Sequence, residues 1–424
     1  MKSESILADS PAIVVGKRFS DFHGKLALVR CGKTGRSIIA AVVMSNSFNR
    51  SSEEEYEVSR YILRELECDQ RDIEIELFSD GLFVYGTLLP KYITPYGAVH
   101  KGWGGLSMYP WVRTVVQDFK LVYSGLPYAV RSESSHLLGV TYLGISDSLE
   151  RHIDSVEIGA GYIKVEVEGQ VVENFPIKPT LMVRMYTCED AKGVCVPSML
   201  FGELFVVDNR RFSYHIDEYF DFLIGNSGIL ITVPHGGFYR PKNMKVKSGV
   251  EADENTFELA KLVVEKIYEL SGYRIVPNAV LARIHRSIVD LNQDSLGTNS
   301  IVRDYHETIE LIASRLRKVF LVDIHGMASR PEWDIEIGTR YGRTVHGNIE
   351  IVANMRDTLR RYGFKVVMDE EFIGGFTINK HSANKNVYAI QIEINRESRM
   401  LKNIDRTAKA LAESILTSYL THMR

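Results

Sequence analysis

The chain has 424 residues and a formal net charge of −3, and this length allows two or three domains that each bury a core. Hydrophobic residues make up 45% of the sequence and charged residues 25%, which is ordinary for a globular protein. This charge balance does not indicate a positively charged surface that would bind nucleic acid. The sequence also lacks a run of about 18 apolar residues that could span a membrane.

The N-terminus lacks the apolar core of a secretory signal peptide. The four cysteines are scattered, and none forms a CxxC pair. We therefore expect free thiols in a reducing cytoplasm rather than a disulfide framework. Cys188 and Cys195 could meet across a turn, but free thiols are favoured at this pair too.

Residues 1–78 carry strand-like runs at 26–29 and 37–43. A charged stretch at 52–67 predicts a helix, because its apolar side chains form one stripe at helical spacing. That stripe comprises Tyr56, Val58, Tyr61, Ile62 and Leu66. This part carries no recognisable chemistry, so we expect a small α+β module that serves packing.

Two further parts follow. Strand patterns dominate residues 79–225, and a turn-rich break at 225–228 ends them. Residues 226–424 alternate strands and helices, which is typical of an α/β doubly wound sheet. Strands are expected at 229–233, 319–322, 365–368 and 387–395, and helices at 253–272, 303–317, 348–362 and 402–419. The chain is thus predicted to be a multidomain protein of α/β and α+β class.

Polar residues follow three of the apolar, β-branched runs in this last part. His235 comes just after the first run, Asp323 and His325 end the second, and Glu393 lies near the end of the third. Such runs read as buried parallel strands, and open α/β sheets place their sites at the carboxyl ends of such strands. Two histidines and a carboxylate meeting there predict a metal site with a general base beside it.

The third metal ligand should be a carboxylate, and Glu251, Asp253 and Glu254 are available after His235. We favour Asp253, because the start of a helix would hold its side chain fixed. Its competing role is to cap that helix.

Two further carboxylates have open roles. Asp323 lies on the same strand face as His325, so it could orient that histidine or bind substrate. Glu393 is the candidate base, since a buried carboxylate needs a charge partner and a metal provides one. The alternative partner for Glu393 is Arg396 or Arg399.

Residues 283–292 suggest that the substrate is acidic. Arg286, Asp290 and Asn292 lie close together after a strand-like run. A guanidinium group binds carboxylates bidentately, which suits an amino-acid carboxylate.

The C-terminal part resembles the N-formylglutamate amidohydrolase family. The matching segments lie at 233–237, 252–256, 286–292, 323–325, 334–338, 374–375 and 391–396. The resemblance implies a carboxypeptidase-like sheet of the zinc exopeptidase type and zinc-dependent cleavage of an N-acyl bond on an acidic amino acid. It implies one zinc ion held by His235, Asp253 and His325, with Glu393 as base. The substrate-binding candidates are Arg286, Asp290, Asn292, Asp323, Gly374, Gly375 and Arg396.

Two positions depart from that family. Gln293 stands where the family often has arginine, and Gly236 where it often has serine. Both departures put the family's namesake substrate in doubt and leave the hydrolytic chemistry in place.

The middle part has its own motif at Tyr85, Gly86, Thr87 and Leu88. A glycine after a strand lets a ligand approach the backbone closely. With the segments at 123–128, 138–142 and 149–157, about 120 residues resemble the γ-glutamylcyclotransferase-like family. That resemblance implies a small mixed β-barrel, a pocket loop at 85–88 and Glu157 as the acid/base that cyclises a γ-glutamyl group.

That chemistry is plausible without a metal, because an intramolecular attack needs mainly positioning and one proton shuttle. Ile158 and Gly159 depart from the family, which tends to have glycine directly after the glutamate. The alternative is a barrel that binds and does not react.

Together these observations predict a zinc amidohydrolase for a small glutamyl-type substrate, fused to a γ-glutamylcyclotransferase-like domain. The alternatives are a two-module sensor of glutamyl metabolites, or a zinc carboxypeptidase or amidase for another acidic acyl-amino acid. No nucleic-acid or membrane partner is expected, and the sequence leaves open whether the chain forms a homo-oligomer.

Overall fold

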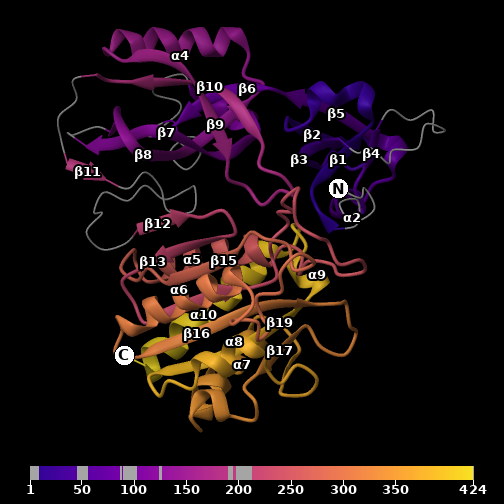
Figure 1. The fold of residues 1–424 in the computed structure, drawn as a ribbon, viewed down its shortest axis with the longest axis vertical. Helices are drawn as coiled ribbons and strands as arrows, with labels where there is room; N and C mark the ends of the chain where they lie inside the picture. Colours follow the sequence, from indigo (N-terminus) through magenta and orange to yellow (C-terminus); the bar gives the residue numbers. More distant parts are fainter. Residues whose placement is uncertain are drawn as a thin grey trace. The chain divides into compact units, whose positions relative to one another are not determined.

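The computed structural model describes residues 9–44, 56–85, 88, 103–123, 127–189, 194–196 and 213–423. The chain divides into two compact units, residues 1–210 and 211–424. Each unit combines strands and helices, so the protein is a multidomain α/β protein (Figure 1). Within these residues no helix is both long enough and apolar enough to cross a membrane.

The first unit begins with a five-stranded sheet in the order β4-β1-β3-β2-β5. Its strands are β1 (Ala12–Val15), β2 (Leu26–Cys31), β3 (Ser37–Met44), β4 (Tyr56–Val58) and β5 (Ile73–Phe78). The strands β1 and β3 pair in parallel and the other neighbours are antiparallel. The short helices are η1 (Lys17–Phe22), α2 (Arg60–Leu66) and η2 (Gln70–Asp72).

The helix predicted at 52–67 is wrong over its middle part. Residues 56–58 form strand β4 against β1, and the helix begins only at Arg60. Ser59 caps it, because its side chain accepts a hydrogen bond from the backbone N–H of Ile62. Residues 52–55 lie outside the described residues. The apolar stripe therefore mixes strand and helix positions.

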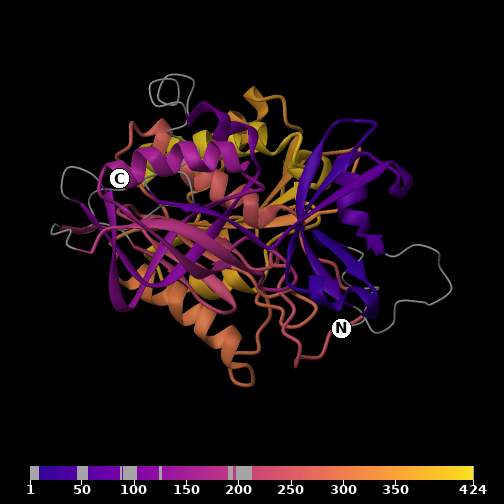
Figure 2. The ribbon, with the colours of Figure 1, turned by 90° about the horizontal axis from the view of Figure 1, so that it is seen from above.

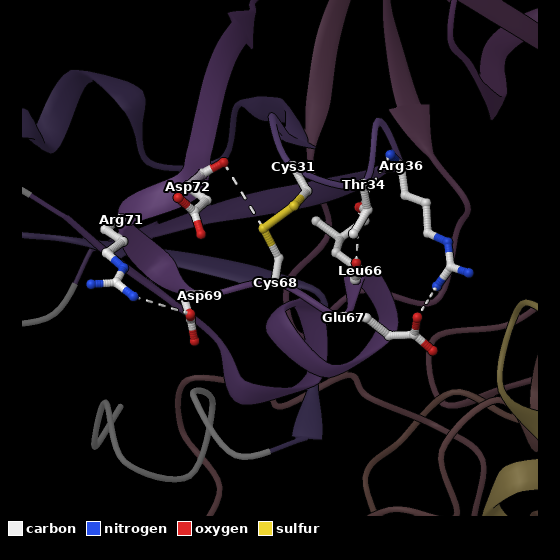
Figure 3. Close-up of a disulfide and its surroundings, with 9 residues drawn as sticks. All are labelled: Cys31, Thr34, Arg36, Leu66, Glu67, Cys68, Asp69, Arg71 and Asp72. Carbon is white, nitrogen blue, oxygen red and sulfur yellow. Dashed lines mark hydrogen bonds and ion pairs between the residues drawn. A yellow bond between two sulfur atoms is a disulfide. The ribbon is translucent and has the colours of Figure 1, made fainter.

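A disulfide between Cys31 and Cys68 joins the end of β2 to the residues after α2 (Figure 3). Two side-chain contacts hold the same places together: Thr34 donates to the carbonyl of Leu66 at 3.1 Å, and Arg36 pairs with Glu67 at 3.0 Å. The prediction of free thiols is thus wrong for this pair, because their separation of 37 residues hides a spatial contact. Cysteine usage therefore no longer indicates a reducing cytoplasm.

The rest of the first unit is a closed mixed barrel. The strands are β6 (Asp80–Val84), β7 (Trp111–Tyr123), β8 (Pro127–Leu143), β9 (Ile163–Val171), β10 (Thr180–Thr187) and β11 (Val194–Val196). Their order is β11-β7-β8-β6-β10-β9, and a further β7–β9 pairing closes the ring. Among the described barrel strands, β6 and β10 pair in parallel and the other neighbours are antiparallel. The prediction of a small mixed barrel is confirmed.

Among the described residues of this part, the helices beside the barrel are η4 (Trp103–Met108) and α4 (Asp147–Gly159). The longer one, α4, packs against β9 and is seen lying along the barrel in both views (Figure 1, Figure 2). Ser146 caps it by accepting from the backbone N–H of Leu149. Barrel and five-stranded sheet share one apolar core, in which Phe78 of β5 and Phe83 of β6 both lie buried.

The second unit is built on an eight-stranded sheet with the order β12-β13-β15-β14-β16-β19-β17-β18. Its strands are β12 (Ser213–Ile216), β13 (Phe220–Ile224), β14 (Ile229–Val233), β15 (Asn278–Ala282), β16 (Val319–Met327), β17 (Ile335–Gly338), β18 (Val366–Met368) and β19 (Val387–Asn395). The first two precede the boundary predicted near residue 225 and join this sheet.

The four central strands β15, β14, β16 and β19 are neighbours and run in parallel, as their apolar runs predict. Every residue of β14 and β15 is buried, so both faces of the sheet are covered. Alternate residues of these strands pack on α6, where Tyr305 and Ile309 enter the core.

The helices of this unit are α5 (Thr256–Leu270), α6 (Ser300–Ser314), α7 (Ile349–Arg361), α8 (Phe376–His381), α9 (Arg396–Arg399) and α10 (Ile404–His422), with η5 (Arg343–Val345). The four long helices fall where the apolar periodicity predicts them. Helix α10 packs against both α5 and α7.

A candidate metal centre

The predicted metal ligands come together at the carboxyl ends of β14 and β16. His235 follows β14 by two residues, and His325 lies within β16, directly opposite Glu393 of β19 in the parallel register. His235, Asp253 and His325 are all buried, and one donor atom from each lies within 4.8 Å of the others. The imidazole rings stand nearly perpendicular, with centroids 4.8 Å apart.

Both imidazoles turn their Nδ1 atoms toward the same carboxylate oxygen. Asp253 Oδ2 lies 3.5 Å from Nδ1 of His235 and 3.3 Å from Nδ1 of His325. The Nδ1 of His235 is buried and makes no hydrogen bond within the described residues. An orphaned buried nitrogen facing a carboxylate fits a metal cation, and two imidazoles with one carboxylate are a donor set that zinc accepts.

A second carboxylate stands behind each imidazole. Asp290 Oδ1 lies 2.7 Å from Nε2 of His235, and Asp323 Oδ2 lies 3.0 Å from Nε2 of His325. An ionised carboxylate only accepts hydrogen bonds, so each Nε2 carries a proton. Asp323 is fixed in turn by the hydroxyl of Thr232, which donates to its Oδ1 at 2.6 Å. Carboxylates in this position orient metal-binding histidines.

Asp253 offers its carboxylate to the site and does not cap α5. The N-cap residue of that helix is Asn255. Asp253 Oδ1 accepts a hydrogen bond from Arg286 at 2.8 Å, and Oδ2 accepts one from the backbone N–H of Gly326 at 3.0 Å. Burial opposes ionisation, but both neighbouring imidazoles outweigh it and hold the pKa of Asp253 well below its usual value.

The other two carboxylates proposed as ligands turn elsewhere. Glu251 lies 3.3 Å and Glu254 3.4 Å from the guanidinium of Arg396. Arg396 is thereby engaged by acidic side chains, although the sequence suggested that it binds substrate. Arg399 is buried and donates to the backbone carbonyls of Ile394 and Met327.

The electrostatics of His325 follow from its neighbours. Burial would lower the pKa of His325, but the charge of Asp323 and the contact with Asp253 raise it well above its usual value. A proton on Nδ1 of His325 would lie where a metal cation binds, and metal binding would release it.

Glu393 lies beside the three ligands. Its Oε1 is 4.0 Å from Nδ1 of His325 and accepts a hydrogen bond from the side-chain amide of Gln391 at 2.8 Å. Burial raises the pKa of Glu393, although the positive charge of His325 works against this shift. A raised pKa suits a group that takes and returns a proton. Neither Arg396 nor Arg399 pairs with Glu393 among the described residues.

The glycine loop before α8, residues 374 and 375, is bound to Gln391 and packs against Asn292. The N–H of Gly375 donates to Gln391 at 2.6 Å, and Thr377 donates to Asn292 Oδ1 from both its N–H and its hydroxyl. A Cβ at Gly375 would lie 2.3 Å from Nδ2 of Asn292, so only glycine permits this approach. Asn292 Nδ2 is also 3.4 Å from Nε2 of His325.

Gln391 begins the segment 391–396 that resembles the family, but the sequence analysis predicted no role for it. It lies two residues before Glu393 on the same strand face, so the alternation of β19 was the available signal.

The barrel motif is only partly visible. Gly86 and Thr87 lie outside the described residues. Leu88 is buried, and its carbonyl accepts from the hydroxyl of Tyr142 at 3.0 Å. Tyr85 donates its hydroxyl to the carbonyl of Tyr186 at 2.6 Å.

Glu157 lies in the last turns of α4, half-buried. Burial raises the pKa of Tyr85, and Tyr162, Glu157 and Cys188 add to this effect. These groups thus share one electrostatic neighbourhood.

Ion pairs fix the helix that carries Glu157. Tyr186 donates to Asp154 at 2.6 Å, Lys164 lies 2.7 Å from the same carboxylate, and Arg184 donates to Glu150 at 2.6 Å. Burial opposes the charge of Asp154, but Lys164 and Tyr186 lower its pKa. This network joins α4 to β9 and β10.

Comparisons with known proteins found solved structures that are similar to parts of this chain. Among solved structures, N-formylglutamate amidohydrolase from Ralstonia eutropha is 15% identical, with 49% of this chain and 96% of that chain covered and a TM-score of 0.38. A bacteriophage poly-gamma-glutamate hydrolase is 14% identical, with 51% and 91% covered and a TM-score of 0.30. An AIG2-like protein from Mus musculus is 21% identical, with 26% and 78% covered and a TM-score of 0.21.

A search of curated proteins found no match. The family model of N-formylglutamate amidohydrolase matches residues 298–400. This segment contains Asp323, His325 and Glu393 and ends before α10. Residues 298–400 therefore carry the sequence pattern of the N-formylglutamate amidohydrolase family.

Proposed function

We propose that residues 226–424 form a zinc-dependent amidohydrolase that cleaves the N-acyl or amide bond of a small acidic, glutamyl-type substrate. The observation that carries the proposal is the pairing of each imidazole with its own carboxylate, Asp290 or Asp323, while both Nδ1 atoms face Asp253. The carboxypeptidase-like sheet suggested by the sequence is part of the same proposal.

His235, Asp253 and His325 would hold the ion. When bound, zinc would polarise the scissile carbonyl and bring the pKa of a water toward about 7. Glu393 removes a proton from the attacking water and delivers it to the nitrogen that leaves. Gln391 holds Glu393 in place, and Asp290 and Asp323 keep both imidazoles in one tautomer.

The test begins with the zinc content of freshly purified protein. About one equivalent is expected in the wild type, and a loss in His235→Ala and in His325→Ala. His152→Ala on α4, an exposed histidine of the first unit, is the control and should keep its zinc. Wild-type protein that takes up no zinc would overturn the metal-dependent mechanism.

Turnover separates an enzyme from a binding protein. Glu393→Gln should keep its zinc and lose about 100-fold or more of its activity on N-acylglutamates. Full activity in that variant would remove Glu393 from the mechanism. Zinc binding without hydrolysis of N-acylglutamates, of γ-glutamyl amides or of small acidic peptides would favour the sensor alternative.

A second activity is supported by the barrel. Glu157 acts in the same electrostatic neighbourhood as Tyr85, and ion pairs fix its helix. We propose that the barrel binds γ-glutamyl groups, with Glu157 as acid/base for release of 5-oxoproline. Formation of 5-oxoproline from γ-glutamyl amides that is lost in Glu157→Gln supports this activity, and equal rates in both proteins would exclude it.

A further inference from the structure

Arg340 lies two residues after the end of β17 and packs against the glycine loop at residues 374 and 375. Its N–H donates to the carbonyl of Ile373 at 2.6 Å, and its Nη1 lies 3.4 Å from the carbonyl of Gly374. A Cβ at Gly374 would lie 3.2 Å from Arg340 Cγ, so the glycine leaves room for the arginine stem. The side chain is half-buried against this loop.

The backbone around Arg340 is strained. Arg340, Tyr341 and Gly342 are all left-handed, with φ angles of 51°, 58° and 80°. A left-handed conformation is unfavourable for a residue with a Cβ, and glycine or asparagine would tolerate it better. Strain of this kind persists where the surrounding structure imposes it, and it gathers at functional sites.

Side chains of the same turn impose this conformation. Thr339 donates from its N–H to Asp369 at 2.6 Å, and its own hydroxyl accepts from the N–H of Gly342 at 2.8 Å. The hydroxyl of Thr344 donates to the carbonyl of Thr339 at 3.0 Å. The turn that carries Arg340 is therefore held from both sides.

Arg340 differs from the other arginines near the centre in its charge balance. Three of those arginines form ion pairs with acidic side chains: Arg286 with Asp253, Arg330 with Glu371, and Arg396 with Glu251 and Glu254. Arg399 is buried and donates to backbone carbonyls. Within the described parts of the chain Arg340 forms no ion pair. Its guanidinium makes one long hydrogen bond, from Nη1 to the carbonyl of Gly374, and its charge has no acidic partner in those parts, so its other N–H groups can bind a carboxylate from outside.

The glycine loop that contacts Arg340 is connected to the proposed base, Glu393, by two hydrogen bonds. Gly375 donates to Gln391, and Gln391 donates to Glu393. A ligand held by Arg340 would therefore lie along the loop that also orients Glu393.

We propose that Arg340 binds a carboxylate of the substrate and so determines the preference for acidic acyl-amino acids. This role rests on the proposed hydrolase function and adds to it the residue that recognises the acid. The planar guanidinium suits a bidentate bond to a carboxylate, which a lysine reproduces less well.

Binding of glutarate, measured by calorimetry on the full chain, tests the role without turnover. Arg340→Asn should weaken binding roughly 10- to 100-fold, since hydrogen bonds to charged groups are worth about 1.5–3 kcal/mol. Arg340→Lys should fall between that variant and the wild type. Arg343→Asn, an exposed arginine three residues away, is the matched control and should bind as the wild type does.

Thermal unfolding of the same variants separates recognition from a structural role. Asparagine suits the left-handed backbone, so Arg340→Asn should unfold at the wild-type temperature or above it while it loses affinity. A fall in unfolding temperature that parallels the loss of binding would assign Arg340 a structural role. Wild-type protein that does not bind glutarate, or an Arg340→Asn variant that binds it normally, would also overturn the proposal.

Kinetics distinguish this proposal from the function on which it rests. With N-formylglutamate, Arg340→Asn should raise KM far more than it lowers kcat, and an unchanged KM would refute the role of Arg340 alone. Glutarate binding that depends on Arg340, in a wild-type protein that hydrolyses no N-acylglutamate, would support Arg340 and refute the hydrolase.

Discussion

Asp290 Oδ1 lies 2.7 Å from Nε2 of His235, on the side of the ring opposite the Nδ1 that faces Asp253. The burial of Asp290 opposes its charge, but His235 and the N–H of Asn292 lower its pKa. Asp290 was predicted to bind substrate, and this geometry gives it a different partner.

We therefore expect Asp290→Asn to weaken zinc binding roughly 10- to 100-fold, because a carboxylate behind a ligand histidine raises its basicity. The measurement is a chelator competition. Asp294→Asn, an exposed aspartate in the same segment, is the control and should keep wild-type affinity. Equal affinity in Asp290→Asn would return Asp290 to the substrate-binding candidates.

Glu336 is a buried carboxylate on β17, directly opposite Glu393 in the antiparallel register. Its Oε1 accepts three backbone N–H groups, from Glu370, Glu371 and Phe372, at 2.9, 2.7 and 2.7 Å. These bonds anchor the segment that leads into the glycine loop.

Glu336→Ala should lower the free energy of unfolding by about 1–3 kcal/mol or more, because buried donors lose their acceptor. Urea unfolding measures the change. Glu370→Ala, an exposed neighbour whose N–H is kept, should stay within about 0.5 kcal/mol of the wild type. A stable Glu336→Ala variant would mean that other contacts hold the segment.

His306 and His381 form a buried pair, with His306 Nδ1 2.9 Å from His381 Nε2. His306 Nε2 forms a hydrogen bond with the carbonyl of Leu291, which lies in the sequence between the site residues Asp290 and Asn292. Burial lowers the pKa of His381 from 6.5 to about 3, and the neighbouring His306 and Lys380 add to the shift. Burial also lowers the pKa of His306.

This lowered pKa makes the folded state sensitive to acid. In the unfolded chain His381 becomes protonated below about pH 6.5, whereas in the folded protein it stays neutral down to about pH 3. Stability should therefore fall with decreasing pH across that window, by up to about 1.4 kcal/mol per pH unit for this group. His381→Gln should show a shallower fall in urea unfolding series between pH 7 and 4. Parallel curves for the two proteins would contradict the assignment.

The Cys31–Cys68 disulfide closes a loop across the five-stranded sheet. Its reduction should lower the stability of the first unit by about 2–4 kcal/mol. Thermal unfolding with and without a reductant measures the effect, and the paired Cys31→Ser, Cys68→Ser variant should lose its response to reductant. Cys188→Ser is the control, because Cys188 is free. Alkylation of Cys31 without prior reduction would show that the bond is absent.

The sequence predicts the elements whose signals are local. Helices α5, α6, α7 and α10 show clear apolar periodicity, and β14, β16 and β19 show continuous apolar runs, so their place and direction follow from spacing alone. The meeting of His235 and His325 follows from the same rule, since parallel strands end at one edge. Asp253 lies in the loop before α5, and it was favoured for its place near a helix start and by the family resemblance.

Long-range partners are what spacing does not reveal. Val58 and Tyr56 suit a helix stripe by sequence, yet pairing with β1 makes them a strand. The partner of Cys68 lies 37 residues away. The strain at Arg340 and the contacts of Glu336 likewise depend on residues 369–374, which only the folded sheet brings close. Whether the proposed residues act as assigned stays a prediction.

The three proposed ligands lie far apart in the sequence, so binding of zinc would be coupled to folding. They come from positions 235, 253 and 325 and meet only after β14 and β16 have paired. Zinc at this centre would bind the folded sheet and have little affinity for the unfolded chain. It would therefore raise the free energy of unfolding by about 4 kcal/mol when its free concentration is a thousand times Kd. Zinc scarcity would then shorten the lifetime of the whole unit, and protein abundance would follow metal supply.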